Sequence, residues 1–230
     1  MKFGVIVFPG SNCDDDMVYV LGKLMQLEVV KLWHKDRDLQ GCDFLVVPGG
    51  FAYGDYLRAG SVARFSPIME SVIAHANNGG NVMGICNGFQ ILTEAGLLPG
   101  ALLQNTNQKY VCKNIFLKPQ TTDSLFTRHL NQEQAYKIPI AHGEGRYHAS
   151  EEILKQLNDH QQVLFRYCQA DGTIDEAANP NGSMENIAGI CNEQRNVFGM
   201  MPHPERASDE LLGNTDGRRF FESLIGQVLA

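Results

Sequence analysis

The stretch Asn81-Val82-Met83-Gly84-Ile85-Cys86-Asn87-Gly88-Phe89-Gln90 decides how the rest of the chain is interpreted. Its apolar first half predicts a buried strand over Asn81–Ile85, and the run Phe89–Ala95 predicts a helix. Glycines flank Cys86 on either side, and a Gly-x-nucleophile-x-Gly segment between a strand and a helix is typical of a tight turn that presents a reactive side chain. Side chains in place of these glycines would collide with neighbouring backbone. The stretch therefore predicts a nucleophilic cysteine on a strand-to-helix turn.

The helix expected after Cys86 favours the reactive thiolate, because its free N–H groups and positive dipole end point at the sulfur. The N–H of Asn87 can then point at an oxyanion, and a second donor is expected from Pro48-Gly49-Gly50-Phe51, at the carboxyl end of another strand. Gln90 lies one helical turn beyond Cys86 and can line the same pocket. The alternative is that Cys86 is a buried structural cysteine and the glycines only form a turn.

The chain has six cysteines without a Cys-x-x-Cys pair or zinc-finger spacing, which favours free thiols in a reducing cytoplasm. Cys13 is the chief rival nucleophile because it also lies near an expected helix start. The three aspartates that follow it disfavour a thiolate there. The remaining cysteines have the character of core or surface residues: Cys42, Cys112, Cys168 and Cys191.

A thiol nucleophile needs a base that is itself held in place. His203 lies in Met201-Pro202-His203-Pro204-Glu205, and a residue before proline is pushed into an extended conformation. Residues two apart in an extended segment face the same side, so Glu205 can orient the imidazole while its other nitrogen faces the pocket. The alternative is a rigid exposed loop with an incidental histidine. The fallback partners are His142, Glu144, Asp209 and Glu210, and His142 to Arg146 could also border the site.

The rest of the chain predicts one mixed α/β domain over residues 1–230. In the first half, apolar runs alternate with helical stretches, which favours a parallel sheet covered on both faces. The expected strands there are Val5–Phe8 and Phe44–Val47, and the expected helices are Asp14–Leu27 and Ser66–Asn77. The second half predicts the strands Asn114–Leu117, Gln134–Ile140 and Gln162–Cys168, a hairpin of Ile187–Cys191 with Val197–Met201, and an amphipathic helix over Asp216–Leu229.

Composition excludes several classes of function. The formal net charge is -7 and no Lys/Arg cluster interrupts the acidity, so a nucleic-acid partner is not expected. No run approaches the ~18 apolar residues of a membrane span. The apolar opening reaches Pro9-Gly10 too soon for a signal peptide, and a cytoplasmic protein is expected.

Three segments resemble the signatures of class I (triad) glutamine amidotransferases: Gly84–Gln90, Pro48–Gly50 and Pro202–Glu205. The resemblance implies an open, mostly parallel, flavodoxin-like α/β sheet. It implies Cys86 as nucleophile, His203 as base and Glu205 as the residue that orients the base. It also implies oxyanion donors at Gly50 and Asn87, a glutamine-holding role for Gln90, and no metal.

Four further stretches are similar to the glutaminase subunits of phosphoribosylformylglycinamidine synthases: Phe8–Asp14, Gly49–Gly60, Ile140–Arg146 and Asn179–Ser183. This resemblance implies purine biosynthesis, in which ammonia from glutamine passes to a synthetase subunit, with a small accessory subunit. ATP and Mg²⁺ are expected on that synthetase, and this chain has no Gly-x-x-x-x-Gly-Lys-[Ser/Thr] loop. The alternatives are a glutaminase that serves another acceptor, a cysteine hydrolase or peptidase on a similar sheet, and a catalytically silent docking subunit.

Overall fold

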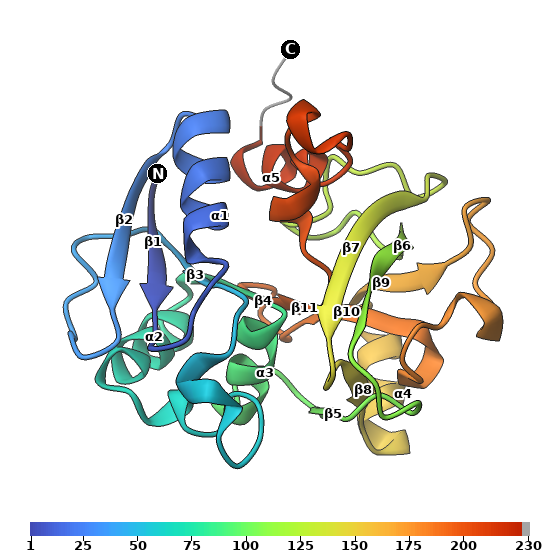
Figure 1. Cartoon of the computed structure of the whole chain (residues 1–230), viewed down its shortest axis with the longest axis horizontal. Helices are drawn as coiled ribbons and strands as arrows, with labels where there is room; N and C mark the ends of the chain where they lie inside the picture. Colours follow the sequence, from blue (N-terminus) through green and yellow to red (C-terminus); the bar gives the residue numbers. More distant parts are fainter. Residues whose placement is uncertain (227–230) are drawn as a thin grey trace.

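A nine-stranded sheet with the order β2-β1-β3-β4-β11-β10-β9-β6-β7 organises the computed structural model, which describes residues 1–226 (Figure 1). Its strands are β1 (Lys2–Val7), β2 (Glu28–Trp33), β3 (Phe44–Val47), β4 (Asn81–Ile85), β6 (Val111–Pro119), β7 (Tyr136–His142), β9 (Val163–Cys168), β10 (Ile187–Cys191) and β11 (Val197–Met200). Neighbours from β2 to β11 pair in parallel, and neighbours from β11 to β7 pair antiparallel. The strands β5 (Ala101–Leu103) and β8 (Arg146–His148) form a separate antiparallel pair.

Helices cover both faces of the parallel half of the sheet. The helices of the described residues are α1 (Asp14–Val18), which continues as a π-helical segment over Tyr19–Leu24, α2 (Pro67–Asn77), α3 (Asn87–Glu94), α4 (Glu151–Asp159) and α5 (Arg218–Ile225), of which α4 lies beside the antiparallel half. In Figure 1, α1 and α5 lie on one side of the central strands β3, β4 and β11, and α2 and α3 lie on the other. Right-handed crossovers explain the placement of α1 and α2, because the chain moves across the sheet in opposite directions from β1 to β2 and from β3 to β4. None of these helices, as far as residue 226, is long and apolar enough to cross a membrane.

The expected open α/β sheet with an antiparallel hairpin is confirmed, and the hairpin is β10 with β11. The first helix ends at Leu24 rather than Leu27, and its second half widens into π-helical turns. The last helix begins at Arg218 rather than Asp216, and the part of its expected range beyond Gly226 lies outside the described residues. Three features were not predicted: the edge strand β2, the helix α4, and the β5–β8 pair.

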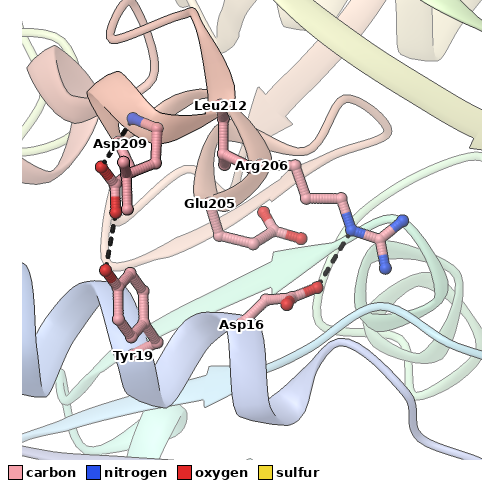
Figure 2. Close-up of a pocket in the computed structure, with 7 residues that line it drawn as sticks. Asp16, Tyr19, Glu205, Arg206, Asp209 and Leu212 are labelled. Atoms are coloured by element: carbon pink, nitrogen blue, oxygen red, sulfur yellow. Dashed lines mark hydrogen bonds and ion pairs between the residues drawn. The ribbon is translucent and has the colours of Figure 1, made fainter.

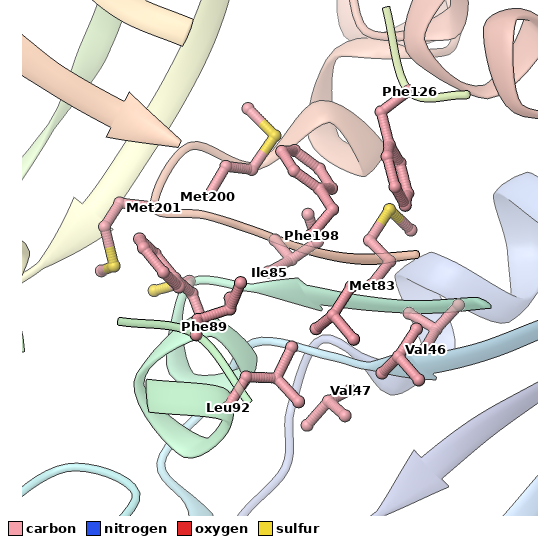
Figure 3. Packing of buried hydrophobic residues seen from close by; sticks show 14 of the residues in the cluster. Val46, Val47, Met83, Ile85, Phe89, Leu92, Phe126, Phe198, Met200 and Met201 are labelled. Atoms are coloured by element: carbon pink, nitrogen blue, oxygen red, sulfur yellow. The ribbon is translucent and has the colours of Figure 1, made fainter. Parts of the chain in front are cut away.

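The core beneath the nucleophile is packed from β3, β4, β11 and α3 (Figure 3). The β3 strand is buried along its whole length, as expected of a strand covered on both faces. Gly199 lets α3 approach β11, because a side-chain carbon there would lie 2.2 Å from Cδ2 of Phe89. The Phe89 ring also stacks on Tyr147, with 6.2 Å between ring centroids. This packing fixes the first turn of α3, and with it the residue that precedes the helix.

Candidate active site

Cys86 joins β4 to α3 in a strained backbone conformation, with φ of 51° and ψ of -108°. Such a positive φ costs a non-glycine residue about 1–3 kcal/mol and is common where function requires a fixed side chain. The flanking glycines are required by space. A side-chain carbon at Gly88 would lie 1.8 Å from the carbonyl oxygen of Val47, and one at Gly84 would lie 2.6 Å from Cδ1 of Leu92. The structure therefore has the tight strand-to-helix turn that the sequence predicts.

Two backbone amides beside Cys86 are free to bind an oxyanion. Asn87 is the first residue of α3, so its N–H has no acceptor within the helix. Gly50 follows β3 with φ of 138°, and a side-chain carbon there would lie 2.7 Å from the amide nitrogen of Asn12. Within residues 1–226 neither amide donates a hydrogen bond to the protein. The carboxyl ends of β3 and β4 thus supply the two donors at the edge where open α/β sheets bind ligands.

His203 and Glu205 meet as a buried pair. Nδ1 of His203 lies 2.6 Å from Oε1 of Glu205, and the two residues are 2% and 3% exposed. The expected extended geometry is only half right: His203 is non-helical (φ -105°, ψ 85°), whereas Glu205 lies in the 3₁₀ turn Pro204–Ala207. The turn still directs the carboxylate back to the ring. The His203 amide also donates to the carbonyl of Pro139 (2.9 Å), which ties the segment to β7.

The structure brings His203 and Cys86 to the same place. Both border Gly49, where a side-chain carbon would lie 2.7 Å from Cε1 of His203 and 3.4 Å from Cβ of Cys86. Both also line one small cavity of about 30 Å³. Nε2 of His203 is buried without a hydrogen-bond partner in the described part of the chain, so it is available to a thiol or a leaving group.

Charge around His203 favours the imidazolium. Burial alone would lower its pKa, but the carboxylate of Glu205 and the sulfurs of Cys86 and Cys13 outweigh burial and raise the pKa of His203 well above its ordinary value. An imidazolium next to a cysteine stabilises a thiolate and can protonate a leaving amine. The arrangement can therefore carry out acyl transfer from an amide to the cysteine.

Cys13 lies closer to this centre than the sequence indicated. Its side chain is buried, and its sulfur accepts a hydrogen bond from Nη2 of Arg206 at 3.1 Å. Arg206 also binds Asp16, with 3.1 Å from Nε to Oδ2. Figure 2 shows Glu205, Arg206 and Asp16 together at a larger neighbouring cavity of about 570 Å³. Neither Arg206 nor Asp16 was a predicted site residue, and both become neighbours of Cys13 only through folding.

One group within residues 1–226 has the side chains to hold a metal ion: ligand atoms of Cys13, His203 and Glu205 lie within 4.8 Å of one another. The Glu205 contact already occupies Nδ1 of His203, and the Arg206 guanidinium lies against the Cys13 sulfur. Positive charge at that position disfavours a divalent cation. We interpret the group as part of the Cys–His–Glu centre.

Cys86 opens into a cavity of about 140 Å³ between the loop after β3 and the loop between β7 and β8. Asn87 links α3 to the first of these loops, because its Oδ1 accepts from the Ala52 amide (3.0 Å) and its Nδ2 donates to Asp55 (3.0 Å). Nδ2 of Asn87 also donates to Oε1 of Gln90, whose Nε2 donates to the Glu144 carbonyl (2.6 Å). The predicted pocket residue Gln90 thus lines the cavity and holds its second wall.

The fallback residues differ in where they lie. His142 borders the cavity but is bound to Asn105 (3.2 Å), and burial, aided by the charge of His203, lowers the pKa of His142 to about 4. It is neutral at pH 7 and serves to fix the loop. Asp209 binds the Tyr19 hydroxyl at 2.6 Å and Glu210 is exposed, so neither orients His203. Arg146 donates to the carbonyl of Gln104 (3.0 Å).

Two carboxylates line the cavity: Asp55, which the sequence analysis did not single out, and Glu144, which lies in the His142 to Arg146 segment expected to border the site. Asp55 and Glu144 both line the cavity beside Cys86. They are 89 positions apart, as the difference of their numbers shows, and no motif spacing relates them. Both lie in glycine-rich segments that follow strands, which is a sequence signal that could also have pointed to Asp55.

Comparison with known proteins gives a consistent assignment. A family model described as "CobB/CobQ-like glutamine amidotransferase domain" matches residues 1–220. A Gloeobacter violaceus protein named "Phosphoribosylformylglycinamidine synthase subunit PurQ" is 57% identical over 230 residues, covering 100% of this chain and 99% of the relative. A Koribacter versatilis protein of the same name is 58% identical over 228 residues, covering 99% of each.

Solved structures agree with the sequence relatives. A chain in "Structure of PurLQS from Thermotoga maritima" superposes with a TM-score of 0.86 at 42% identity, covering 98% of this chain and 97% of that one. The glutaminase domain of Trypanosoma brucei CTPS, solved with bound acivicin, has a TM-score of 0.61 at 12% identity, covering 100% of this chain and 96% of that one, and shows the shared fold alone. The resemblance read from Gly84–Gln90 is thereby confirmed. This chain belongs to the CobB/CobQ-like glutamine amidotransferase family.

Proposed function

We propose that this chain is the glutaminase subunit of a phosphoribosylformylglycinamidine synthase, with Cys86 as nucleophile, His203 as base and Glu205 as its orienter. One observation carries the proposal: a strained cysteine lies beside two free amides and a buried histidine that is bound to a glutamate at 2.6 Å. This is the set of groups that amide hydrolysis through a thioester requires.

The mechanism follows from these positions. The Cys86 thiolate attacks the carboxamide carbon of glutamine, and the N–H groups of Gly50 and Asn87 hold the resulting oxyanion. The imidazolium of His203 protonates the departing ammonia, which leaves a thioester on Cys86. His203 then takes a proton from water, hydroxide attacks the thioester, and glutamate leaves. Removing one oxyanion donor typically raises such a barrier by ~3 kcal/mol, so the two amides matter nearly as much as the side chains.

The acceptor of the ammonia is inferred from the relatives. The Gloeobacter violaceus and Koribacter versatilis relatives align over essentially the whole chain and carry the synthase subunit name, and the Thermotoga maritima relative is described within a PurLQS structure. We infer that this chain passes ammonia to a synthetase subunit, which makes formylglycinamidine ribonucleotide, and that a small accessory subunit joins the complex. ATP and Mg²⁺ are proposed to bind that synthetase rather than this chain, and the complex is proposed to act in the cytoplasm.

The decisive test separates glutamine use from ammonia use. In a complex of this chain with its synthetase, Cys86→Ala should abolish amidine formation from glutamine and leave formation from ammonium intact. Cys112→Ala, which removes an exposed thiol from β6, is the matched control and should retain both activities. Glutamine-dependent turnover by Cys86→Ala would overturn the assignment of the nucleophile. Absence of amidine formation by the wild-type complex with either nitrogen source would overturn the assignment of the acceptor.

A further inference from the structure

The end of β7 and the loop that follows it contact the nucleophilic turn through backbone carbonyls. The carbonyl of Ala141 lies 3.8 Å from Sγ of Cys86, and the carbonyl of Glu144 accepts from Nε2 of Gln90 at 2.6 Å. Glycines flank Glu144 on both sides, and glycine leaves a backbone free to adopt many conformations. The position of this loop beside the nucleophile therefore has to be fixed by groups outside it.

Such groups come from Asn179–Ser183, a stretch that the sequence analysis singled out and that the proposed mechanism does not use. Asn181 and Ser183 are 1% and 3% exposed, and neither lines the cavity beside the nucleophile. Nδ2 of Asn181 donates to the Gly145 carbonyl at 2.9 Å, and Oδ1 of Asn181 accepts from the Ser183 hydroxyl at 2.8 Å. The same hydroxyl accepts from the Tyr147 amide at 3.0 Å. The stretch thus binds the end of the loop from behind the cavity wall.

Asn105, which is 1% exposed, binds the rest of the loop. Its Oδ1 accepts from the Gly145 amide at 3.1 Å, and its Nδ2 donates to the His142 carbonyl at 3.0 Å. Its own amide donates to the Gly143 carbonyl at 2.9 Å, and the amide of the next residue donates to the Asn181 carbonyl at 3.1 Å. The two asparagines therefore hold the amide and the carbonyl of Gly145 and are joined to each other.

The stretch that carries Asn181 is itself held in one conformation. Oδ1 of Asn179 accepts from the Gly182 amide at 2.8 Å, and Nδ2 of Asn179 donates to the Ser183 carbonyl at 2.8 Å. Gly182 has φ of 83°, and a side-chain carbon there would lie 2.2 Å from Cγ2 of Thr106. Buried amide groups cost free energy unless they are paired, so a fully paired cluster of this kind favours a single arrangement.

We propose that Asn181 is a positioning residue for amide hydrolysis, which acts through the Gly145 carbonyl to keep the Glu144 carbonyl on Gln90 and the loop against Cys86. This inference rests on the proposed glutaminase function and adds to it a residue that lies outside the cavity. Without the Asn181 donor, the loop is in place in only a fraction of the molecules, and glutamine has to select that fraction. The apparent dissociation constant then rises by the inverse of the fraction, so the loss appears in KM rather than in kcat.

Asn181→Asp tests this role with a small change of shape. It keeps an acceptor for the Ser183 hydroxyl and replaces the donor to the Gly145 carbonyl by an oxygen. Asn181→Ala, which adds no charge to the cluster, is the second variant. Asn196→Asp is the matched control, because Asn196 is also buried and its Nδ2 donates to two backbone carbonyls at the end of α2, at 2.7 and 2.8 Å, away from the loop.

The complex with the synthetase is assayed for KM and kcat with glutamine, for amidine formation from ammonium, and for the rate at which iodoacetamide alkylates Cys86. Urea denaturation of the full chain verifies that each variant folds. Both Asn181 variants should raise the KM for glutamine by about 10-fold, with kcat within about twofold of wild type. Alkylation of Cys86, which is 6% exposed, should become several-fold faster, because the loop no longer stays against it. Asn196→Asp should match wild type in KM and alkylation, and all variants should keep the ammonium activity.

Unchanged KM and unchanged alkylation in the two folded Asn181 variants would overturn the positioning role. The same changes in Asn196→Asp would also overturn it, since they would reflect lost stability alone. Faster alkylation of Cys86 in the Asn181 variants, without glutamate release by the wild-type complex, would overturn the glutaminase proposal and leave the positioning of the loop supported.

Discussion

The replacement of Glu205 by glutamine tests how the carboxylate acts on His203. Oε1 of Glu205 accepts from Nδ1 of His203 at 2.6 Å, and Oε2 is buried without a partner in the described part of the chain. A glutamine that keeps its oxygen at the first position loses a charged hydrogen bond, worth about 1.5–3 kcal/mol, and buries an unpaired amide, which costs about 1–3 kcal/mol more. If the amide flips instead, it donates to Nδ1 and forces the proton onto Nε2, where it blocks the base.

Both arrangements raise the barrier to the chemical step more than they weaken glutamine binding. A loss of about 3–5 kcal/mol corresponds to a kcat lower by about 10²- to 10⁴-fold. The assay measures glutamate release and ammonium-dependent amidine formation by the same complex, and only the first should fall. Glu222→Gln, which alters another buried glutamate that is paired with Arg219 at 3.0 Å, is the control. A Glu205→Gln complex with kcat within about tenfold of wild type would refute this account of the pair.

Three further predictions concern strain, ionisation and stability. Gly88→Ala should destabilise the fold by more than about 3 kcal/mol in urea denaturation, because its side chain would meet the Val47 carbonyl at 1.8 Å, whereas Gly22→Ala, with its nearest neighbour at 3.8 Å, should be close to neutral. The KM for glutamine should fall as pH rises through about 6, because Asp55 then ionises next to Glu144 while His142 stays neutral. Asp55→Asn should flatten this pH profile of KM in steady-state kinetics. A pH profile that Asp55→Asn leaves unchanged would contradict the reasoning. The pKa of His203 is raised in the folded state, so the contribution of His203 to stability is complete below its unfolded pKa and is lost as pH rises through its folded pKa. The free energy of unfolding should therefore differ more between wild type and Glu205→Gln at pH 6 than at pH 9. An equal difference at the two pH values would count against the ion pair.

The strand-to-helix turn at Cys86 and the parallel half of the sheet were predictable from sequence because their signals are local. Gly84 and Gly88 are required by contacts with Leu92 and Val47, so the spacing around Cys86 encodes its own geometry. The contact between His203 and Glu205 was also predictable from their spacing, although Glu205 reaches His203 from a 3₁₀ turn rather than from an extended segment. The predicted contact is present in the structure, whereas the predicted backbone conformation between the two residues is wrong.

The structural features that the sequence analysis did not predict had sequence signals that were either weak or not used. Strand β2 lies at an edge with Leu32 alone fully buried, so its hydrophobic period is poor. Helix α4 had a readable start, because the Ser150 side chain accepts from the Ile153 amide and two glutamates follow. The pairing of Asp55 with Glu144, and that of Cys13 with Arg206, depend on loops brought together by the whole sheet, and no spacing along the chain predicts them.

The most direct test of the central claim is to locate the thiol that attacks glutamine. An electrophilic glutamine analogue is incubated with the wild-type complex, with and without excess glutamine, and the modified peptide is identified by mass spectrometry. We expect one adduct on Cys86, suppressed by glutamine, absent from Cys86→Ala and retained by Cys13→Ser. An adduct on Cys13, or one on Cys86 that glutamine does not suppress, would contradict the account.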